Sequence, residues 1–171
     1  SEGAIADGIV AAARRNPRGG TLTLDDLQSA QARRFEPVCG PYRAYHVCST
    51  NAPASGNALI AILGLYERAR PHPEGLNNAD DWAAFLWASR LSFADRDYYM
   101  ADDTAVPVPT QDLINPVYLD ARALLIDVAR APEQAPPGAP PGHPDLYDRW
   151  GRDIGEDTGT THIAIVDGWG N

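Results

Sequence analysis

Apolar side chains recur every three or four residues in several parts of the chain, which is the spacing of one face of an α-helix. The first such segment covers residues 4–15, and the run Asn16-Pro17-Arg18-Gly19-Gly20 stops it. In the second, Thr23 is placed to cap a short helix that reaches about Gln31, with an acidic residue, Asp26, at the third helical position. The sequence therefore predicts two short helices near the start of the chain.

Three further helices are predicted in the middle of the chain. Residues 58–66 are apolar on every side, so a helix there belongs in the interior. Residues 78–99 form the longest predicted helix, and most of its large apolar residues follow one stripe. The stripe consists of Trp82, Phe85, Leu86, Ser89 and Phe93. In the third helix Asn115 is the N-cap and Pro116 takes the first helical position, and we expect this helix to reach about Ala129.

Residues 35–49 are rich in aromatic and β-branched side chains and predict a β-hairpin. With residues 40–43 as its turn, Cys39 and Cys48 lie at different levels of the hairpin, too far apart for a disulfide. We therefore expect two buried thiols. On the second strand, Cys48 shares one face with His46.

Proline is concentrated between Ala131 and Pro144, where we expect an extended, flexible surface linker. Beyond it, residues 162–167 alternate between the two faces of a predicted β-strand. Asp167-Gly168 then gives the turn signal of a hairpin, but no second strand follows. We interpret the chain as a piece of a longer precursor.

The overall composition limits the possible partners. With 171 residues, 44% hydrophobic and 22% charged, the chain has the size and composition of one globular domain. Its formal net charge of −9 argues against nucleic-acid binding, which needs a basic surface. No apolar run approaches the roughly 20 residues that cross a bilayer, so no membrane span is expected.

The run Gly159-Thr160-Thr161-His162 is the candidate for catalysis. A threonine hydroxyl is a weak nucleophile unless a base lies beside it, and a free α-amine on the same residue can be that base. Cleavage before Thr160 would create this arrangement. Taken alone, however, the two threonines are also ordinary residues for the entry to a strand.

Two other groups of polar residues are assigned no chemistry. His46, His72 and His143 are scattered, with no spacing that brings them onto one ion, so we expect neither a metal site nor a cofactor. Asp95 and Arg96, on the longest helix, are expected to form a structural ion pair rather than a ligand site.

Ordered landmarks along nearly the whole chain resemble the γ-glutamyltransferase family of N-terminal nucleophile hydrolases. They are Gly3–Ala6, Gly19–Leu27, Glu36–Val38, Tyr42–Val47, Pro53–Gly56, Ser92–Arg96, Val106–Pro109 and Thr160–His162. Each landmark is weak alone, but their order and spacing are specific. The chain departs from the family pattern at Ala44 and Asn57, where the family commonly has glycine, and this affects the expected loop geometry rather than the nucleophile.

The resemblance implies an α+β fold: a mostly helical fragment of a four-layer αββα sandwich, with a short hairpin and a C-terminal strand. Residues 1–130 would be the C-terminal part of a large subunit. Residues 131–159 would be the proline-rich linker leading to the cleavage site, and residues 160–171 the truncated first strand of a small subunit.

The resemblance also implies a self-processing enzyme. The precursor would cut itself between Gly159 and Thr160, and Thr160 would then attack the γ-glutamyl group of a donor such as glutathione, with water or an amino acid as acceptor. Thr161 and His162 are candidate supporting residues. The small subunit of the same precursor is the expected partner, and the donor-binding residues lie outside this fragment, which should be inactive alone. Periplasmic or extracellular export is implied by the family.

Two alternatives remain open at this point. One is a β-lactam (cephalosporin) side-chain acylase of the same superfamily, which would use the same nucleophile with another pocket. The other is a non-catalytic relative in which the fold serves only for packing or interaction.

Overall fold

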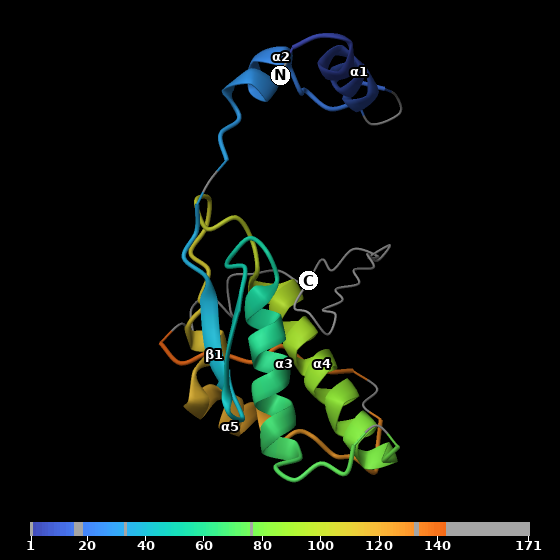
Figure 1. Cartoon of the computed structure of the whole chain (residues 1–171), viewed down its shortest axis with the longest axis vertical. Helices are drawn as coiled ribbons and strands as arrows, with labels where there is room; N and C mark the ends of the chain where they lie inside the picture. The colour runs from blue at the N-terminus through green and yellow to red at the C-terminus, as the bar shows by residue number, and fades with distance from the viewer. Residues whose placement is uncertain (1, 16–18, 33, 76, 132–133, 143–171) are drawn as a thin grey trace, which may run out of the picture. The chain divides into compact units, whose positions relative to one another are not determined.

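The computed structural model describes residues 2–15, 19–32, 34–75, 77–131 and 134–142. These residues fall into two compact units, one up to Phe35 and one from Glu36 onward (Figure 1). The described part combines helices with a two-stranded antiparallel hairpin, as the predicted α+β class requires.

The first unit holds two helices, α1 (Ala4–Ala13) and α2 (Leu24–Ser29). The predicted cap of α2 is confirmed: Thr23 Oγ1 accepts a hydrogen bond from Asp26 N at 3.1 Å, and Asp26 Oδ2 accepts one from Thr23 N at 2.8 Å. The Thr23 hydroxyl also donates to Asp26 Oδ2 at 2.6 Å, and this bond, together with the one from Thr23 N, holds the pKa of Asp26 below its usual value.

The hairpin of the second unit consists of β1 (Val38–Tyr42) and β2 (Tyr45–Ser49). The hairpin itself is confirmed, but the predicted turn at residues 40–43 is wrong, because the chain reverses at Arg43 and Ala44. Arg43 takes the left-handed conformation, with φ of 54°, and its N–H donates to Glu67 Oε1 at 2.9 Å. The hydrogen bond to Glu67 helps to hold a conformation that residues other than glycine rarely adopt.

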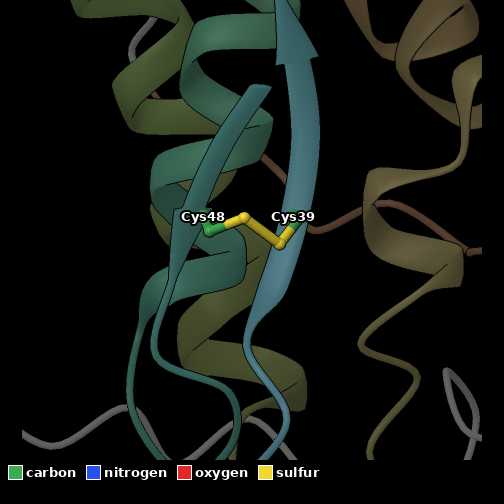
Figure 2. The surroundings of a disulfide bond; sticks show 2 residues. All are labelled: Cys39 and Cys48. Carbon is green, nitrogen blue, oxygen red and sulfur yellow. A yellow bond between two sulfur atoms is a disulfide. The ribbon is translucent and has the colours of Figure 1, made fainter. Parts of the chain in front are cut away.

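The shifted turn places Cys39 directly opposite Cys48, with their Cα atoms 4.1 Å apart, and a disulfide joins them (Figure 2). The expectation of two free buried thiols is therefore wrong. Its cause is the misplaced turn, since a register error changes which residues face each other across a hairpin. The assumed burial is also wrong, because Cys48 is exposed.

Helix α3 (Gly56–Ala69) lies beside α4 (Ala79–Tyr99), and the two form the centre of the second unit (Figure 1). The predicted interior position of α3 is confirmed. The main core cluster consists of Ala61, Ile62, Leu65, Ala88, Leu91 and Leu119. The hairpin packs on α3 so closely that a Cβ atom at Gly40 would collide with Ile60 Cγ2.

Helix α4 covers the predicted residues 78–99 except the first, because Asn78 is its N-cap: Asn78 Oδ1 accepts a hydrogen bond from Asp81 N at 3.0 Å. Its buried face carries small residues, including Ala84 and Ala88. The stripe of large apolar residues lies outside this face: Trp82, Phe85, Leu86 and Phe93 are all exposed. Small side chains at the contact permit close approach of α3, so they form the core face.

A 3₁₀ turn (Asp112–Ile114) precedes α5 (Pro116–Ala123), and the predicted Asn115 cap is confirmed by its hydrogen bond from Val117 N at 2.9 Å. The helix ends at Ala123 rather than near Ala129. Beyond it, Trp87 Nε1 donates to the carbonyls of Asp127 and Arg130, at 2.7 and 2.8 Å, which holds this part of the backbone in turns.

A buried carboxylate, Asp95 on α4, joins three parts of the chain. Asp95 Oδ1 accepts hydrogen bonds from Arg122 Nη2 at 3.0 Å and from Gly138 N at 2.7 Å, and Oδ2 accepts one from Tyr118 Oη at 2.9 Å. The predicted Asp95–Arg96 pair is wrong: Asp95 lies on the buried face of α4, whereas Arg96 donates to Ser55 Oγ at 2.8 Å. Asp95 therefore pairs with Arg122.

Residues 134–142 form neither helix nor strand, in agreement with the predicted linker, but they are held more firmly than a flexible linker would be. Arg122 Nη2 donates to Pro136 O at 2.8 Å, Tyr99 Oη donates to Gly138 O at 2.7 Å, and Pro140 is fully buried. A Cβ atom at Gly138 would collide with Tyr118, so glycine is required for this close approach.

The surroundings of Asp95 act on its charge in opposite directions. Burial raises the pKa of the carboxyl above its usual value, and the positive charge of Arg122 and the hydrogen bonds from Gly138 and Tyr118 offset only part of that increase. Burial and the nearby Asp95 raise the pKa of Tyr118, so its hydroxyl stays protonated and able to donate.

Within the described ranges, no helix is long and apolar enough to cross a lipid bilayer.

We predict that Asp95→Asn lowers the free energy of unfolding by about 3–5 kcal/mol, because it leaves the buried Arg122 guanidinium without its counter-charge. Urea denaturation followed by circular dichroism measures the change. The matched control is Asp97→Asn, on the same helix. Asp97 is exposed and pairs with Arg96, so its loss should cost less than about 1 kcal/mol. Equal losses for the two variants would contradict the assignment of Asp95 as the buried anchor.

Candidate functional site

The predicted catalytic residue, Thr160, lies outside the described residues, as do Gly159, Thr161 and His162. Their roles therefore remain predictions. Residues 134–142, which come earlier in the sequence, are described and are anchored at Gly138 by the Asp95 carboxylate.

A cavity of about 510 Å³ lies in the second unit, at the end of α3 and the start of α4. Its lining residues are Tyr42, Arg43, Tyr66, Pro73, Gly75, Asp81, Trp82 and Phe85. Phe85 makes edge-to-face contacts with Tyr66 and Trp82, each with ring centroids 6.1 Å apart. The wall of this cavity is therefore largely aromatic.

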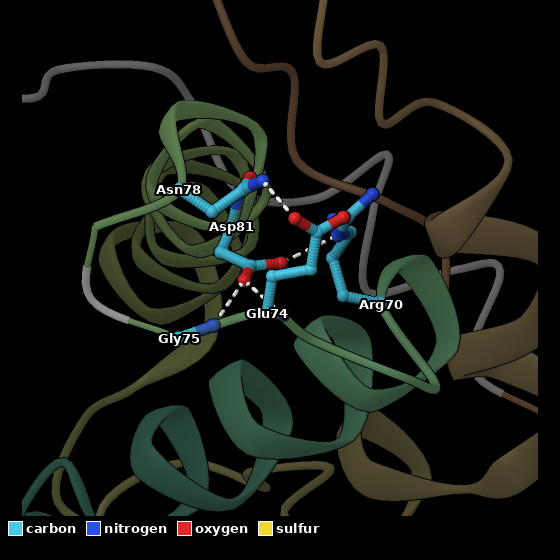
Figure 3. Close-up of polar contacts among 5 residues, drawn as sticks. All are labelled: Arg70, Glu74, Gly75, Asn78 and Asp81. Carbon is cyan, nitrogen blue, oxygen red and sulfur yellow. Dashed lines mark hydrogen bonds and ion pairs between the residues drawn. The ribbon is translucent and has the colours of Figure 1, made fainter.

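Asp81 is the buried acidic group of this cavity, and its oxygens are already engaged (Figure 3). Oδ1 accepts a hydrogen bond from Arg70 Nε at 2.5 Å, and Oδ2 accepts bonds from the N–H groups of Glu74 and Gly75 at 2.6 and 2.8 Å. Asn78 Nδ2 in turn donates to Glu74 Oε2 at 3.1 Å. The cluster closes the loop between α3 and α4.

Burial raises the pKa of Asp81, but the hydrogen bonds from Arg70, Gly75 and Glu74 and the charge of Arg70 together bring it below its usual value. A carboxylate with a lowered pKa and occupied lone pairs is a poor general base. We therefore assign Asp81 a structural role in holding the entry to α4. The sequence showed Asp81 only as an acidic residue in the first helical turn, and its partner Arg70 lies on the other side of a loop.

The structure brings together a second group that the sequence interpretation missed. The ligand atoms of Cys39, His46 and Cys48 all lie within 4.8 Å of one another on the hairpin. The shared face of His46 and Cys48 was visible in the strand alternation, but the misplaced turn hid Cys39. The expectation of no metal site considered only the spacing of the histidines and left cysteine ligands out.

This chain is similar in sequence to known proteins. The sequence profile of the family described as gamma-glutamyltranspeptidase matches residues 2–171, which includes the Gly159–Thr160 bond. A glutathione hydrolase proenzyme of Escherichia coli (strain K12) is 32% identical over 171 residues, covering 99% of this chain and 27% of the relative. The chain thus spans about a quarter of the length of the curated relatives it matches.

Two further relatives bear on fold and chemistry. The crystal structure of Helicobacter pylori gamma-glutamyltranspeptidase matches with a TM-score of 0.66 and 31% identity, over 79% of this chain and 39% of that chain. An Acylase ACY 1 proenzyme from Pseudomonas sp. (strain V22) is 31% identical over 154 residues, covering 90% of this chain and 25% of the relative. Because the family profile matches nearly every residue, the chain belongs to the gamma-glutamyltranspeptidase family.

Proposed function

We propose that the protein containing this chain is a self-processing precursor that transfers or hydrolyses the γ-glutamyl group of glutathione-like donors, with Thr160 as its nucleophile. The observation that carries the proposal is the family match over residues 2–171, which includes the Gly159-Thr160-Thr161-His162 run. The E. coli relative is named glutathione hydrolase proenzyme, and this name supports two parts of the proposal: a glutathione-like donor and synthesis as a precursor.

In the first stage, Thr160 Oγ attacks the carbonyl carbon of Gly159. The Gly159–Thr160 C–N bond breaks, an ester forms on Oγ, and the Thr160 nitrogen leaves as a free amine. Water then hydrolyses the ester, which gives a carboxylate on Gly159 and restores the Thr160 hydroxyl. The products are two chains, of which the second begins with the nucleophile. Thr161 and His162 are candidates to support this step.

In the second stage, the new α-amine of Thr160 accepts the proton of its own hydroxyl as Oγ attacks the γ-carbonyl carbon of the donor. The donor's amine leaves with a proton, and water or the amine of an acceptor amino acid resolves the acyl-enzyme ester. Each preorganised hydrogen-bond donor to the tetrahedral oxyanion contributes about 2.7–4 kcal/mol. We place these donors, and the groups that bind the glutamyl moiety, in the remainder of the precursor.

The described residues contribute a scaffold to this proposal. The hydrogen bonds of Asp95 and Tyr99 to Gly138 fix the start of the segment that runs on toward Gly159. The proposed partners are therefore the small subunit of the same precursor, the γ-glutamyl donor and the acceptor. Export to the periplasm or the exterior is part of the proposal and rests on family membership alone.

A specific observation favours a second candidate function. The similarity to the Pseudomonas proenzyme named Acylase ACY 1 reaches 31% identity, close to that of the E. coli hydrolase. A side-chain acylase would use the same processing and the same nucleophile. The two candidates differ only in the acyl group that the pocket accepts.

We predict that Thr160→Ala prevents self-cleavage, because the variant has no hydroxyl to attack Gly159. Intact-mass measurement of the full precursor after incubation should show a fragment beginning at Thr160 in the unmodified protein and none in the variant. Thr160→Ser is the matched control, since it keeps a hydroxyl at the same position and should still be cut. Failure of the unmodified precursor ever to yield this fragment would refute the processing, and would favour a non-catalytic relative.

We also predict that the processed protein turns over glutathione, and that Thr160→Ala lowers this activity by more than about a thousandfold, as loss of a catalytic nucleophile does. Release of glutamate, or of the γ-glutamyl product with an added acceptor, measures the reaction. Glutaryl-cephalosporanic acid is the comparison substrate. Turnover of that compound without turnover of glutathione would contradict the assignment as a γ-glutamyltransferase and favour the acylase.

A further inference from the structure

Three side chains that can bind metal ions share one face of the hairpin. Cys39 on β1 lies directly opposite Cys48 on β2, and His46 precedes Cys48 by two positions, so the side chains of all three point to the same side. Their sulfur and imidazole nitrogen atoms lie within 4.8 Å of one another. In the described form the two sulfurs are joined as a disulfide (Figure 2).

This face of the hairpin is the one directed away from α3. The opposite face carries Val38, which is fully buried, and Gly40, which packs against Ile60 of α3. His46 and Cys48 are exposed, and Cys39 is half-buried. An ion can therefore reach all three side chains without disturbing the contact between the hairpin and α3.

We propose that Cys39, His46 and Cys48 form a redox-controlled Zn²⁺ site: the disulfide closes it, and reduction opens it. Two thiolates and one imidazole are a ligand set that Zn²⁺ prefers, with Zn–S near 2.3 Å and Zn–N near 2.0–2.1 Å. Tetrahedral geometry at these lengths places the two sulfurs about 3.8 Å apart. The cysteine Cα atoms, 4.1 Å apart across the strands, allow this separation by side-chain rotation alone.

The charge of the ligands and the coordination position that they leave open both suit Zn²⁺. Two thiolates neutralise Zn²⁺ locally, and the net charge of −9 draws cations toward the chain. Because Cys39, His46 and Cys48 supply three ligands, water completes the tetrahedron. The same two strands are cross-linked in either form, by sulfur–sulfur bonding when oxidised and by the ion when reduced.

The exchange between the two forms balances with a low-molecular-weight thiol as reductant. Two thiol molecules give up two electrons and two protons and leave as their own disulfide, while Cys39 and Cys48 become thiols. Zn²⁺ then displaces both thiol protons as the two Zn–S bonds form. Disulfide and metal exclude each other because each uses the same sulfur electron pairs. This inference does not rest on γ-glutamyl transfer.

The test compares the oxidised protein with protein reduced by a phosphine that is then removed. Co²⁺ serves as the probe, because thiolate ligation gives it strong charge-transfer and ligand-field absorption bands. We expect the reduced protein to bind Co²⁺ with thiolate bands and to lose them on addition of Zn²⁺, and the oxidised protein to show neither. Absence of thiolate bands from the reduced protein would overturn the proposal.

Variants separate the three-ligand site from a simple pair of thiols. His46→Gln, an exposed change that leaves both cysteines in place, should weaken Zn²⁺ binding more than about tenfold, since even outer-shell losses cost 10–100-fold. His72→Gln, another exposed histidine, is the matched control and should bind as the unmodified protein does. Cys48→Ser should abolish the thiolate bands of a two-sulfur site. Equal affinity in His46→Gln, or unchanged affinity in urea-unfolded reduced protein, would show that the folded hairpin does not build the site.

Discussion

The arrangement of the second unit depends most on the buried Asp95 carboxylate. Its oxygens accept hydrogen bonds from Tyr118 and Arg122 on α5 and from the backbone of Gly138, so one group on α4 fixes both later segments. Leaving a buried charge without such partners costs several kcal/mol, which penalises any docking of α5 that breaks the set. The network therefore selects one arrangement, whatever its net contribution to stability.

The helix that carries Asp95 shows how packing decides which face becomes the core. Alanine at positions 84 and 88 lets α3 approach α4 closely, and α5 completes the cluster through Leu119. The large side chains of α4 are then left outside this contact, where Trp82 and Phe85 become part of a cavity wall. Hydrophobicity alone would have favoured the opposite face, but close contact between helices depends on side-chain size as well.

Features that depend on neighbouring residues could be predicted from the sequence. The predicted caps at Thr23 and Asn115 act within two or three residues, and both are confirmed. The partners of Asp95 could not be predicted, because Arg122 and Gly138 are distant in sequence and meet it only after α5 has docked. The assignment of Thr160 has a different basis, since it comes from a motif and stays a prediction.

In the hairpin, the position of the turn determines which side chains meet on the exposed face. Gly40-Pro41 has the composition of a turn, but Gly40 is used for close approach to Ile60, and Arg43 takes the left-handed conformation instead. Cys39 and Cys48 face each other only if the chain reverses midway between them, at Arg43 and Ala44. The turn and the disulfide thus specify the same register, and the cross-link opposes any slip that would release Arg43. The same register places His46 near the two sulfurs, so the position of the turn determines which three ligands come together.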